Sequence, residues 1–159
     1  MSTVKYYDWS YHQARTRPNK VAVKEVSTGR ETTYGQLEER SCRLASWLQN
    51  KGVKKGDRVA ILIHNCTEVF ELEFACAKIG AIELPLNWRL TKPELEYILN
   101  DSSPEVLIYG SNFADTAKAL TTDCSIKNSL EIDDEDQNNE YEQALKENID
   151  FDVVETTHD

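Results

Sequence analysis

A continuous apolar run, RVAILI at residues 58–63, constrains the fold of this chain more than any other feature. A strand with one wet face alternates apolar and polar residues, whereas an unbroken run is typical of a strand buried on both faces of a parallel sheet. EVLIYG at 105–110 has the same character, and AIELPL at 81–86 is short and apolar-rich. Helical patterns separate these segments, so we predict an α/β fold with a mainly parallel sheet flanked by helices.

Polar pairs spaced three residues apart predict where the helices begin, because their side chains satisfy free backbone N–H groups there. These pairs are Thr33 with Gln36, Asn65 with Glu68, and Thr91 with Glu94. In the helix predicted over 68–79, which Gly80 should end, the polar residues form a narrow stripe of Glu68, Glu71 and Lys78. The other expected elements are a helix over 6–17, a hairpin over 21–33, a helix over 112–120, a strand over 130–132 and a helix over 141–147.

The net charge of −10 comes from one end of the chain. Residues 131–159 contain 12 of the 28 Asp and Glu residues and a single Lys or Arg, whereas residues 1–130 contain 16 acids and 17 bases. We interpret 1–130 as an α/β body and 131–159 as an acidic connecting segment, for which a solvated loop is a more frequent explanation than an interaction arm. Without a basic excess on the body, no nucleic-acid partner is expected.

Membrane-spanning and secreted proteins are not expected either. The longest apolar run, Val59–Ile63, is far shorter than the roughly 20 residues of a membrane helix, and the first residues lack the apolar region of a signal peptide. The four cysteines, Cys42, Cys66, Cys76 and Cys124, lack the spacing of a metal or redox site, so buried free thiols are expected. We predict a cytoplasmic protein.

Five residues near the expected sheet are candidates for chemistry, and we favour a structural explanation for each. His64 beside Cys66 offers a base and a thiol, although neighbours in one loop rarely form such a pair. Glu73 is either a carboxylate with a shifted pKa or a residue at the boundary of the core whose charge reaches solvent. Asn87 and Arg89 either touch a ligand or form turn and loop hydrogen bonds. Because no glycine-rich phosphate loop or nucleophile motif is present, no catalytic, cofactor-binding or metal-ligating residue is assigned.

A set of short pieces has a recognisable order and spacing: Thr33-Tyr34 with Leu37, Gly52-Val53 with Lys55-Gly56-Asp57-Arg58-Val59, Asn65 with Glu68, Gly80-Ala81, Pro85-Leu86-Asn87 with Arg89-Leu90, and Glu94-Leu95 with Ile98-Leu99. Through these pieces, residues 33–108 resemble the amino-terminal part of the acyl-CoA synthetases, within the adenylate-forming superfamily. The run Leu86–Leu90 is similar to fatty-acyl and related acyl- or aryl-CoA ligases. Amino-acid adenylation domains typically have Asp in place of Asn87.

The resemblance implies an incomplete portion of the large N-terminal domain of an AMP-forming acid–thiol ligase. Such an enzyme uses ATP with Mg²⁺ to convert a carboxylic acid, here expected to be a fatty acid, into an acyl-adenylate, and CoA then displaces AMP. The family's phosphate loop, nucleotide motifs, metal-binding glutamate and catalytic lysine have no counterpart here, and residues 153–159 resemble the stretch leading into that loop. We therefore expect an N-terminal fragment that is inactive alone, has none of these cofactors bound, and self-associates through uncovered sheet edges.

Two alternatives stay open from the sequence. The chain is either a free-standing binding module without catalysis, or part of another adenylate-forming enzyme, such as an aryl-CoA ligase, a luciferase-like enzyme or a peptide-synthetase adenylation domain. The acyl chain length, the parent's oligomeric state, a partner for residues 131–159 and the residues after Asp159 are not determined by these patterns.

Overall fold

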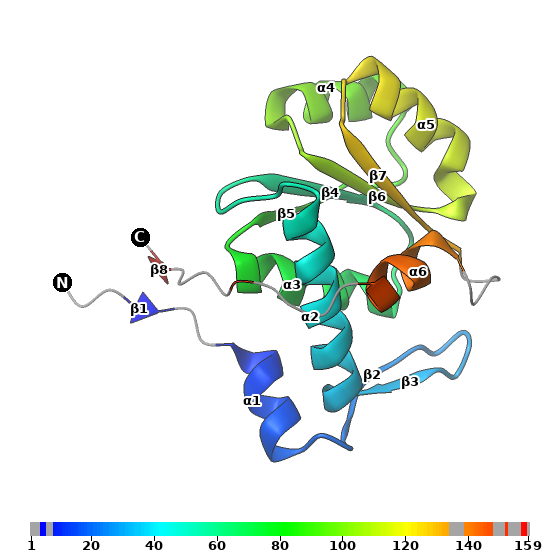
Figure 1. Ribbon diagram of the computed structural model, residues 1–159. Helices are drawn as coiled ribbons and strands as arrows, with labels where there is room; N and C mark the ends of the chain where they lie inside the picture. The colour runs from blue at the N-terminus through cyan, green and yellow to red at the C-terminus, as the bar shows by residue number, and fades with distance from the viewer. Residues whose placement is uncertain (1–3, 6–7, 134–138, 148–151, 153–156, 159) are drawn as a thin grey trace.

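The computed structural model describes residues 4–5, 8–133, 139–147, 152 and 157–158 (Figure 1). A four-stranded parallel sheet in the order β5-β4-β6-β7 lies between two layers of helices. Its strands are β4 (Arg58–Leu62), β5 (Ile82–Pro85), β6 (Val106–Gly110) and β7 (Asn128–Ile132). The predicted α/β fold with a mainly parallel sheet is confirmed.

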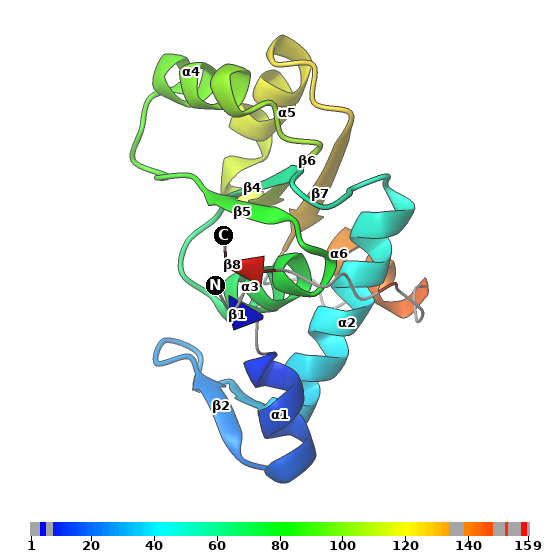
Figure 2. The same cartoon turned by 90° about the vertical axis from the view of Figure 1, so that its left-hand side faces the viewer.

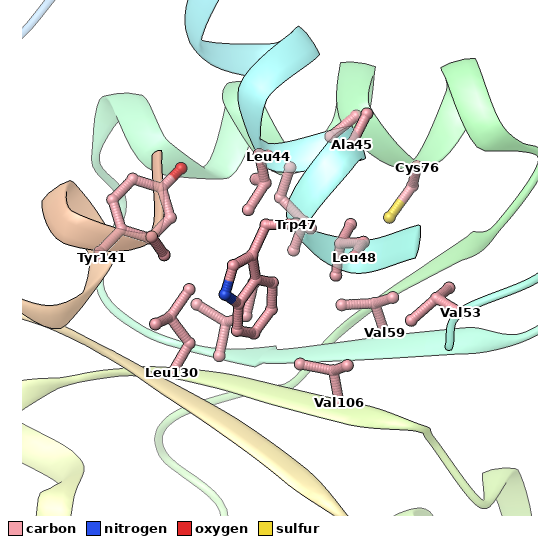
Figure 3. Packing of buried hydrophobic residues seen from close by; sticks show 14 of the residues in the cluster. Leu44, Ala45, Trp47, Leu48, Val53, Val59, Cys76, Val106, Leu130 and Tyr141 are labelled. Carbon is pink, nitrogen blue, oxygen red and sulfur yellow. The ribbon is translucent and has the colours of Figure 1, made fainter. Parts of the chain in front are cut away.

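The unbroken apolar runs have the expected cause, because both faces of the sheet are covered. Val59 and Ile61 of β4 face a core shared with α2 (Tyr34–Asn50), α3 (Thr67–Ile79) and α6 (Glu140–Glu147). Ala60 and Leu62 face a second core beneath α4 (Lys92–Ser102) and α5 (Ala114–Asp123). Figure 3 shows the first core, in which Leu44, Trp47 and Leu48 of α2 lie over the sheet and Tyr141 of α6 closes one side.

The N-terminal elements lie away from the sheet, beside the first half of α2 and beneath α3 (Figures 1 and 2). They are α1 (Trp9–Thr16) and an antiparallel hairpin of β2 (Val21–Lys24) and β3 (Glu31–Thr33). Asp8 caps α1 by accepting a hydrogen bond from the Tyr11 amide at 2.9 Å, so the helix begins later than the predicted residue 6. Residues 6–7 of that prediction lie outside the described residues. Three short elements remain among the described residues: η1 (Ser111–Phe113), and β1 (Val4–Lys5), which pairs antiparallel with β8 (Thr157–His158).

Two of the three predicted capping pairs are confirmed: Thr33 with Gln36 at α2, and Thr91 with Glu94 at α4. The prediction of Asn65 with Glu68 is wrong, because α3 begins at Thr67, and its N-cap residue, Cys66, makes no side-chain capping bond. A distant residue takes over this role. The carboxylate of Glu25, at the end of β2, accepts hydrogen bonds from the Thr67 amide at 2.9 Å and from its hydroxyl at 2.8 Å.

The polar stripe of α3 does not face solvent. Glu68, Glu71 and Lys78 are only 3%, 1% and 3% exposed, because α1, α2 and the hairpin cover this side of the helix. Charged side chains are rarely buried to this degree unless each has a partner of opposite charge. The predicted stripe is therefore an internal feature.

Each residue of the stripe belongs to a group of one cation and two carboxylates, which we call the α3 triads. The triads are Arg30 with Glu25 and Glu68, Arg40 with Glu71 and Glu142, and Lys78 with Asp8 and Glu38. The shortest distances from α3 are 2.6 Å from Glu71 to Arg40 and 2.6 Å from Lys78 to Asp8. Through these ion pairs α3 is connected to the hairpin, to α2 with α6, and to α1 with α2.

Glu71, the α3 member of the Arg40 triad, has a second buried partner besides its cation. The hydroxyl of Tyr141, a residue 1% exposed, donates a hydrogen bond of 2.7 Å to Glu71. Burial raises the pKa of Glu71 even though Arg40 beside it acts in the opposite direction. Arg40 therefore favours the ionised form of Glu71 against the effect of burial.

β5 is an edge strand of the sheet, and β4 is its only partner among the described strands. The backbone amides of Ile82 and Leu86 point toward β4. The backbone amides of alternate residues between them point to the free edge, and Pro85 at such a position has no N–H group.

One carboxylate oxygen of Glu83, also on β5, is buried without a hydrogen-bond partner among the described residues. Burial and the nearby charge of Glu73 raise the pKa of Glu83 to about 7.

Replacing Arg40 with Met should lower the free energy of unfolding by about 3–5 kcal/mol, because Glu71 would be left buried without a cation. Changing Glu71 to Leu in the same variant should restore most of that loss, since the unpaired charge is then gone. Urea unfolding followed by circular dichroism measures both changes.

Arg43→Met is the matched control on the same helix. Arg43 pairs with the exposed Glu39 and also donates to the Leu145 carbonyl, so its loss should cost no more than about 1 kcal/mol. Equal losses for the two arginine variants would contradict the central role of the buried triad.

Candidate functional site

All four strands of the parallel sheet end at the same edge, because they run in the same direction. The segments that follow are His64–Cys66 after β4, Asn87–Trp88 after β5, Ser111–Phe113 after β6 and Asp133 after β7. In open α/β sheets, ligands bind outside the carboxyl ends of the strands. We therefore take this edge as the candidate functional site.

Three rings from adjacent strand ends meet at this edge, and we call them the edge aromatic cluster. The centre of the His64 ring lies 4.6 Å from that of Trp88 and 5.0 Å from that of Phe113, both in edge-to-face arrangements. His64 is exposed and Trp88 is 37% exposed, so the cluster borders solvent. Sequence reasoning missed Trp88 and Phe113, although their positions just after strand ends were a usable signal.

The segment after β5 forms a turn. The Asn87 side chain accepts a hydrogen bond from the Arg89 amide at 3.1 Å, and the Asn87 carbonyl accepts one from the Leu90 amide at 3.0 Å. The Arg89 guanidinium stacks on the Trp88 ring, 4.0 Å from its centre. The turn-forming interpretation of Asn87 is confirmed, and Arg89 holds the same loop by stacking on a ring.

The structure does not bring His64 and Cys66 together as a base and a nucleophile. His64 contacts the edge aromatic cluster, whereas Cys66 is the N-cap residue of α3. Burial, then the charge of Glu68, raise the pKa of the Cys66 thiol, which keeps it protonated. Glu73 is exposed on α3, so its charge reaches solvent as the boundary interpretation expects.

A polar cleft of about 470 Å³ lies beside the ends of β4 and β7, between the hairpin and α6. Its charged lining consists of one cation, Arg30, and four carboxylates: Glu25, Glu68, Asp133 and Glu142. Arg30 donates to both oxygens of Glu68, at 2.8 and 2.9 Å. Arg30, the one cation among the described residues that line the cleft, is thus engaged by carboxylates.

Glu25 connects this cleft to the helix behind it. Burial favours the neutral acid, but hydrogen bonds from Thr67, Arg30 and Thr28 outweigh it and hold the pKa of Glu25 at about 2. Glu25 is therefore an anion at neutral pH that caps α3 and orients Arg30. Over the described residues, no group of three or more His, Cys, Asp or Glu side chains is arranged to hold a metal ion.

The four cysteines are free thiols, as expected from their spacing. Cys76 is buried, and the other three are partly buried. In the part of the chain that the structure describes, no helix has the length and apolar character needed to cross a membrane.

Comparison with known families decides what kind of domain carries this edge. A family model described as AMP-binding enzyme matches residues 10–158. The chain belongs to the AMP-binding enzyme family. The resemblance of residues 33–108 to adenylate-forming enzymes is thereby confirmed and extended to nearly the whole chain.

Curated relatives of this AMP-binding chain include ligases for different acids. The chain is 43% identical over 112 residues to a feruloyl-CoA synthase of Amycolatopsis, covering 70% of this chain and 22% of that protein. It is 39% identical over 118 residues to the long-chain-fatty-acid–CoA ligase FadD13 of Mycobacterium tuberculosis, covering 74% of this chain and 24% of that one. The chain thus spans about a quarter of the length of these relatives.

Solved structures agree with the AMP-binding fold. The inhibitor-bound N-terminal domain of FACL13 from Mycobacterium tuberculosis superposes with a TM-score of 0.81 at 31% identity, covering 95% of this chain and 38% of that one. The anthranilate CoA ligase AuaEII, solved with anthranoyl-AMP, gives a TM-score of 0.84 at 24% identity over 96% of this chain and 30% of its own. The similarity to AuaEII, at 24% identity, shows only that the two proteins share a fold.

Replacing Glu25 with Gln should lower the free energy of unfolding by about 1–2 kcal/mol near neutral pH, because charged hydrogen bonds to Arg30 and Thr67 are weakened. The folded pKa of about 2 lies below the ordinary value of 4.5, so this stabilisation is complete above pH 4.5 and disappears as the pH falls towards 2. Urea unfolding at several pH values measures the difference.

Glu31→Gln in the same hairpin is the control. Glu31 pairs with Lys24 on the surface, so its replacement should change stability by less than about 1 kcal/mol. A Glu25→Gln deficit that stayed constant down to low pH would refute the assigned role of its charge.

Proposed function

We propose that this chain is the N-terminal part of an ATP-dependent, AMP-forming acyl-CoA ligase and that it supplies scaffold rather than catalytic groups. The observation that carries the proposal is the AMP-binding family match over residues 10–158, with curated relatives that are acyl-CoA ligases. We place the enzyme in the cytoplasm, where its four free thiols would stay reduced.

The proposed reaction has two steps. A carboxylate oxygen of the acid attacks the α-phosphorus of ATP, the bond to the β-phosphate breaks, and pyrophosphate leaves. The sulfur of CoA then attacks the acyl carbon of the adenylate, AMP leaves, and the thiol proton goes to solvent or a base. The carboxylate becomes reactive because AMP is a far better leaving group than oxide.

The proposed substrate is a fatty or similarly hydrophobic acid. The likeness to the ligase FadD13 supports it, and so does the run Leu86–Leu90, which is similar to that of fatty-acyl and related ligases. The likeness to a feruloyl-CoA synthase favours an aryl acid as the second candidate. Comparing ferulate with a long-chain fatty acid as substrates of a complete enzyme carrying this N-terminal part would separate the two.

The described charged groups that line the polar cleft do not fit ATP phosphates or the Mg²⁺ that the family implies. The polar cleft carries four carboxylates, and its cation Arg30 is already bonded to two of them. Glu25 and Glu68 are occupied by Arg30, so they are not open ligands for a divalent ion. We therefore assign no step of the reaction to these residues.

The 159-residue chain alone should release no pyrophosphate from ATP, Mg²⁺ and either ferulate or a long-chain fatty acid. The physical reason is that the polar cleft repels a polyphosphate and its cation is engaged. A coupled pyrophosphate assay measures this, with a complete feruloyl-CoA synthase as positive control. Circular dichroism must show a folded chain, and a rate above the protein-free background would refute the prediction.

Self-association of this chain is a separate expectation. β5 presents a free edge beside Ile82, which is 52% exposed, although Pro85 removes one donor from that edge. Light scattering at increasing concentration should therefore show species larger than a monomer, and Ile82→Lys should reduce them. A monodisperse monomer at high concentration would contradict this expectation.

A further inference from the structure

Residues 9–23 carry charge of the opposite sign to the chain as a whole. They include Arg15, Arg17 and Lys20 and no Asp or Glu, whereas the net charge of the chain is −10. This stretch forms α1, the turn after it and most of β2. These elements lie together at the end of the molecule away from the parallel sheet, as both views show (Figures 1 and 2).

Large apolar side chains are exposed on the same elements. Trp9 is 60% exposed, Tyr11 49% and Val21 39%. The Arg15 guanidinium lies 5.6 Å from the centre of the Tyr11 ring and donates a hydrogen bond of 2.9 Å to its hydroxyl. The Tyr11 ring and the Arg15 guanidinium are therefore neighbours on α1, whose inner residue Ser10 is buried.

The cations of this surface have no carboxylate partners among the residues that the structure describes. Arg15 bonds to a phenol, and neither Arg17 nor Lys20 forms an ion pair there. The carboxylates that border the stretch are already engaged: Asp8 lies 2.6 Å from Lys78, and Glu31 lies 2.6 Å from Lys24. The positive charge is therefore available to an external anion.

We propose that residues 9–23 form a binding surface for anionic lipid bilayers. Tryptophan and tyrosine favour the boundary between water and lipid, and basic residues are attracted to anionic headgroups. A single-stranded nucleic acid would use the cations and would stack a base on Trp9, but it gives no reason for Val21 to be exposed beside them. The combination of side chains fits a bilayer surface better, and this binding does not depend on ligase activity.

Screening limits the repulsion from acidic residues that lie farther away, because charges more than about 10 Å apart are largely screened at 0.1 M ionic strength. Two described carboxylates of α2 and α6 are in addition engaged by cations: Glu38 pairs with Lys78, and Glu142 pairs with Arg40.

Sedimentation with vesicles tests the proposal on the 159-residue chain. The chain should bind vesicles of phosphatidylcholine with roughly 30% phosphatidylserine at about 0.1 M salt, and should not bind phosphatidylcholine alone. The triple variant Arg15→Gln, Arg17→Gln, Lys20→Gln should partition roughly a hundredfold more weakly, at about fivefold for each cation. Brominated lipid should quench tryptophan fluorescence in the parent chain and much less in Trp9→Phe.

The matched control is the triple variant Lys54→Gln, Lys118→Gln, Lys127→Gln. It removes three exposed cations elsewhere and therefore has the same net charge as the first triple variant. It should bind vesicles like the parent chain, and circular dichroism should show that both triple variants are folded. Equal binding to both lipid compositions, or equal loss in the two triple variants, would overturn the proposal. So would binding to a single-stranded RNA without binding to vesicles.

Discussion

The charge buried on α3 is the constraint on which the elements outside the sheet depend. Glu68, Glu71 and Lys78 cannot remain ionised beneath α2 without partners, because the cost of removing a charge from water is several kcal/mol. Each partner comes from a different part of the chain: the hairpin, α2 with α6, and α1. The ion pairs therefore select one arrangement of these elements, whereas apolar contacts alone would tolerate several.

The order of the elements could be predicted because strand burial, capping pairs and helix ends are local patterns. RVAILI predicted a strand covered on both faces, and Thr33 and Thr91 marked true helix starts. The start of α3 could not be predicted in this way, since its capping carboxylate, Glu25, lies 42 residues earlier in the chain. No window of local sequence contains that interaction.

Less of the candidate site could be predicted. Asn87 was placed correctly as a turn residue, and the pairing of His64 with Cys66 was rightly disfavoured. The edge aromatic cluster was missed because its rings come from three strand ends whose adjacency follows from the strand order β5-β4-β6. The burial of the α3 stripe was missed for a similar reason, since periodicity identifies a polar side but not what packs on it.

The antiparallel pair of β1 and β8 bears on the order of folding. It joins Val4 to His158 and Lys5 to Thr157, so it closes a loop of nearly the whole chain. In an unfolded polypeptide, closing such a loop would cost about 5 kcal/mol of chain entropy, more than a two-residue ladder returns. This pair can form only after the sheet and the α3 triads have drawn the ends together, which makes it the last contact to form and the first to open.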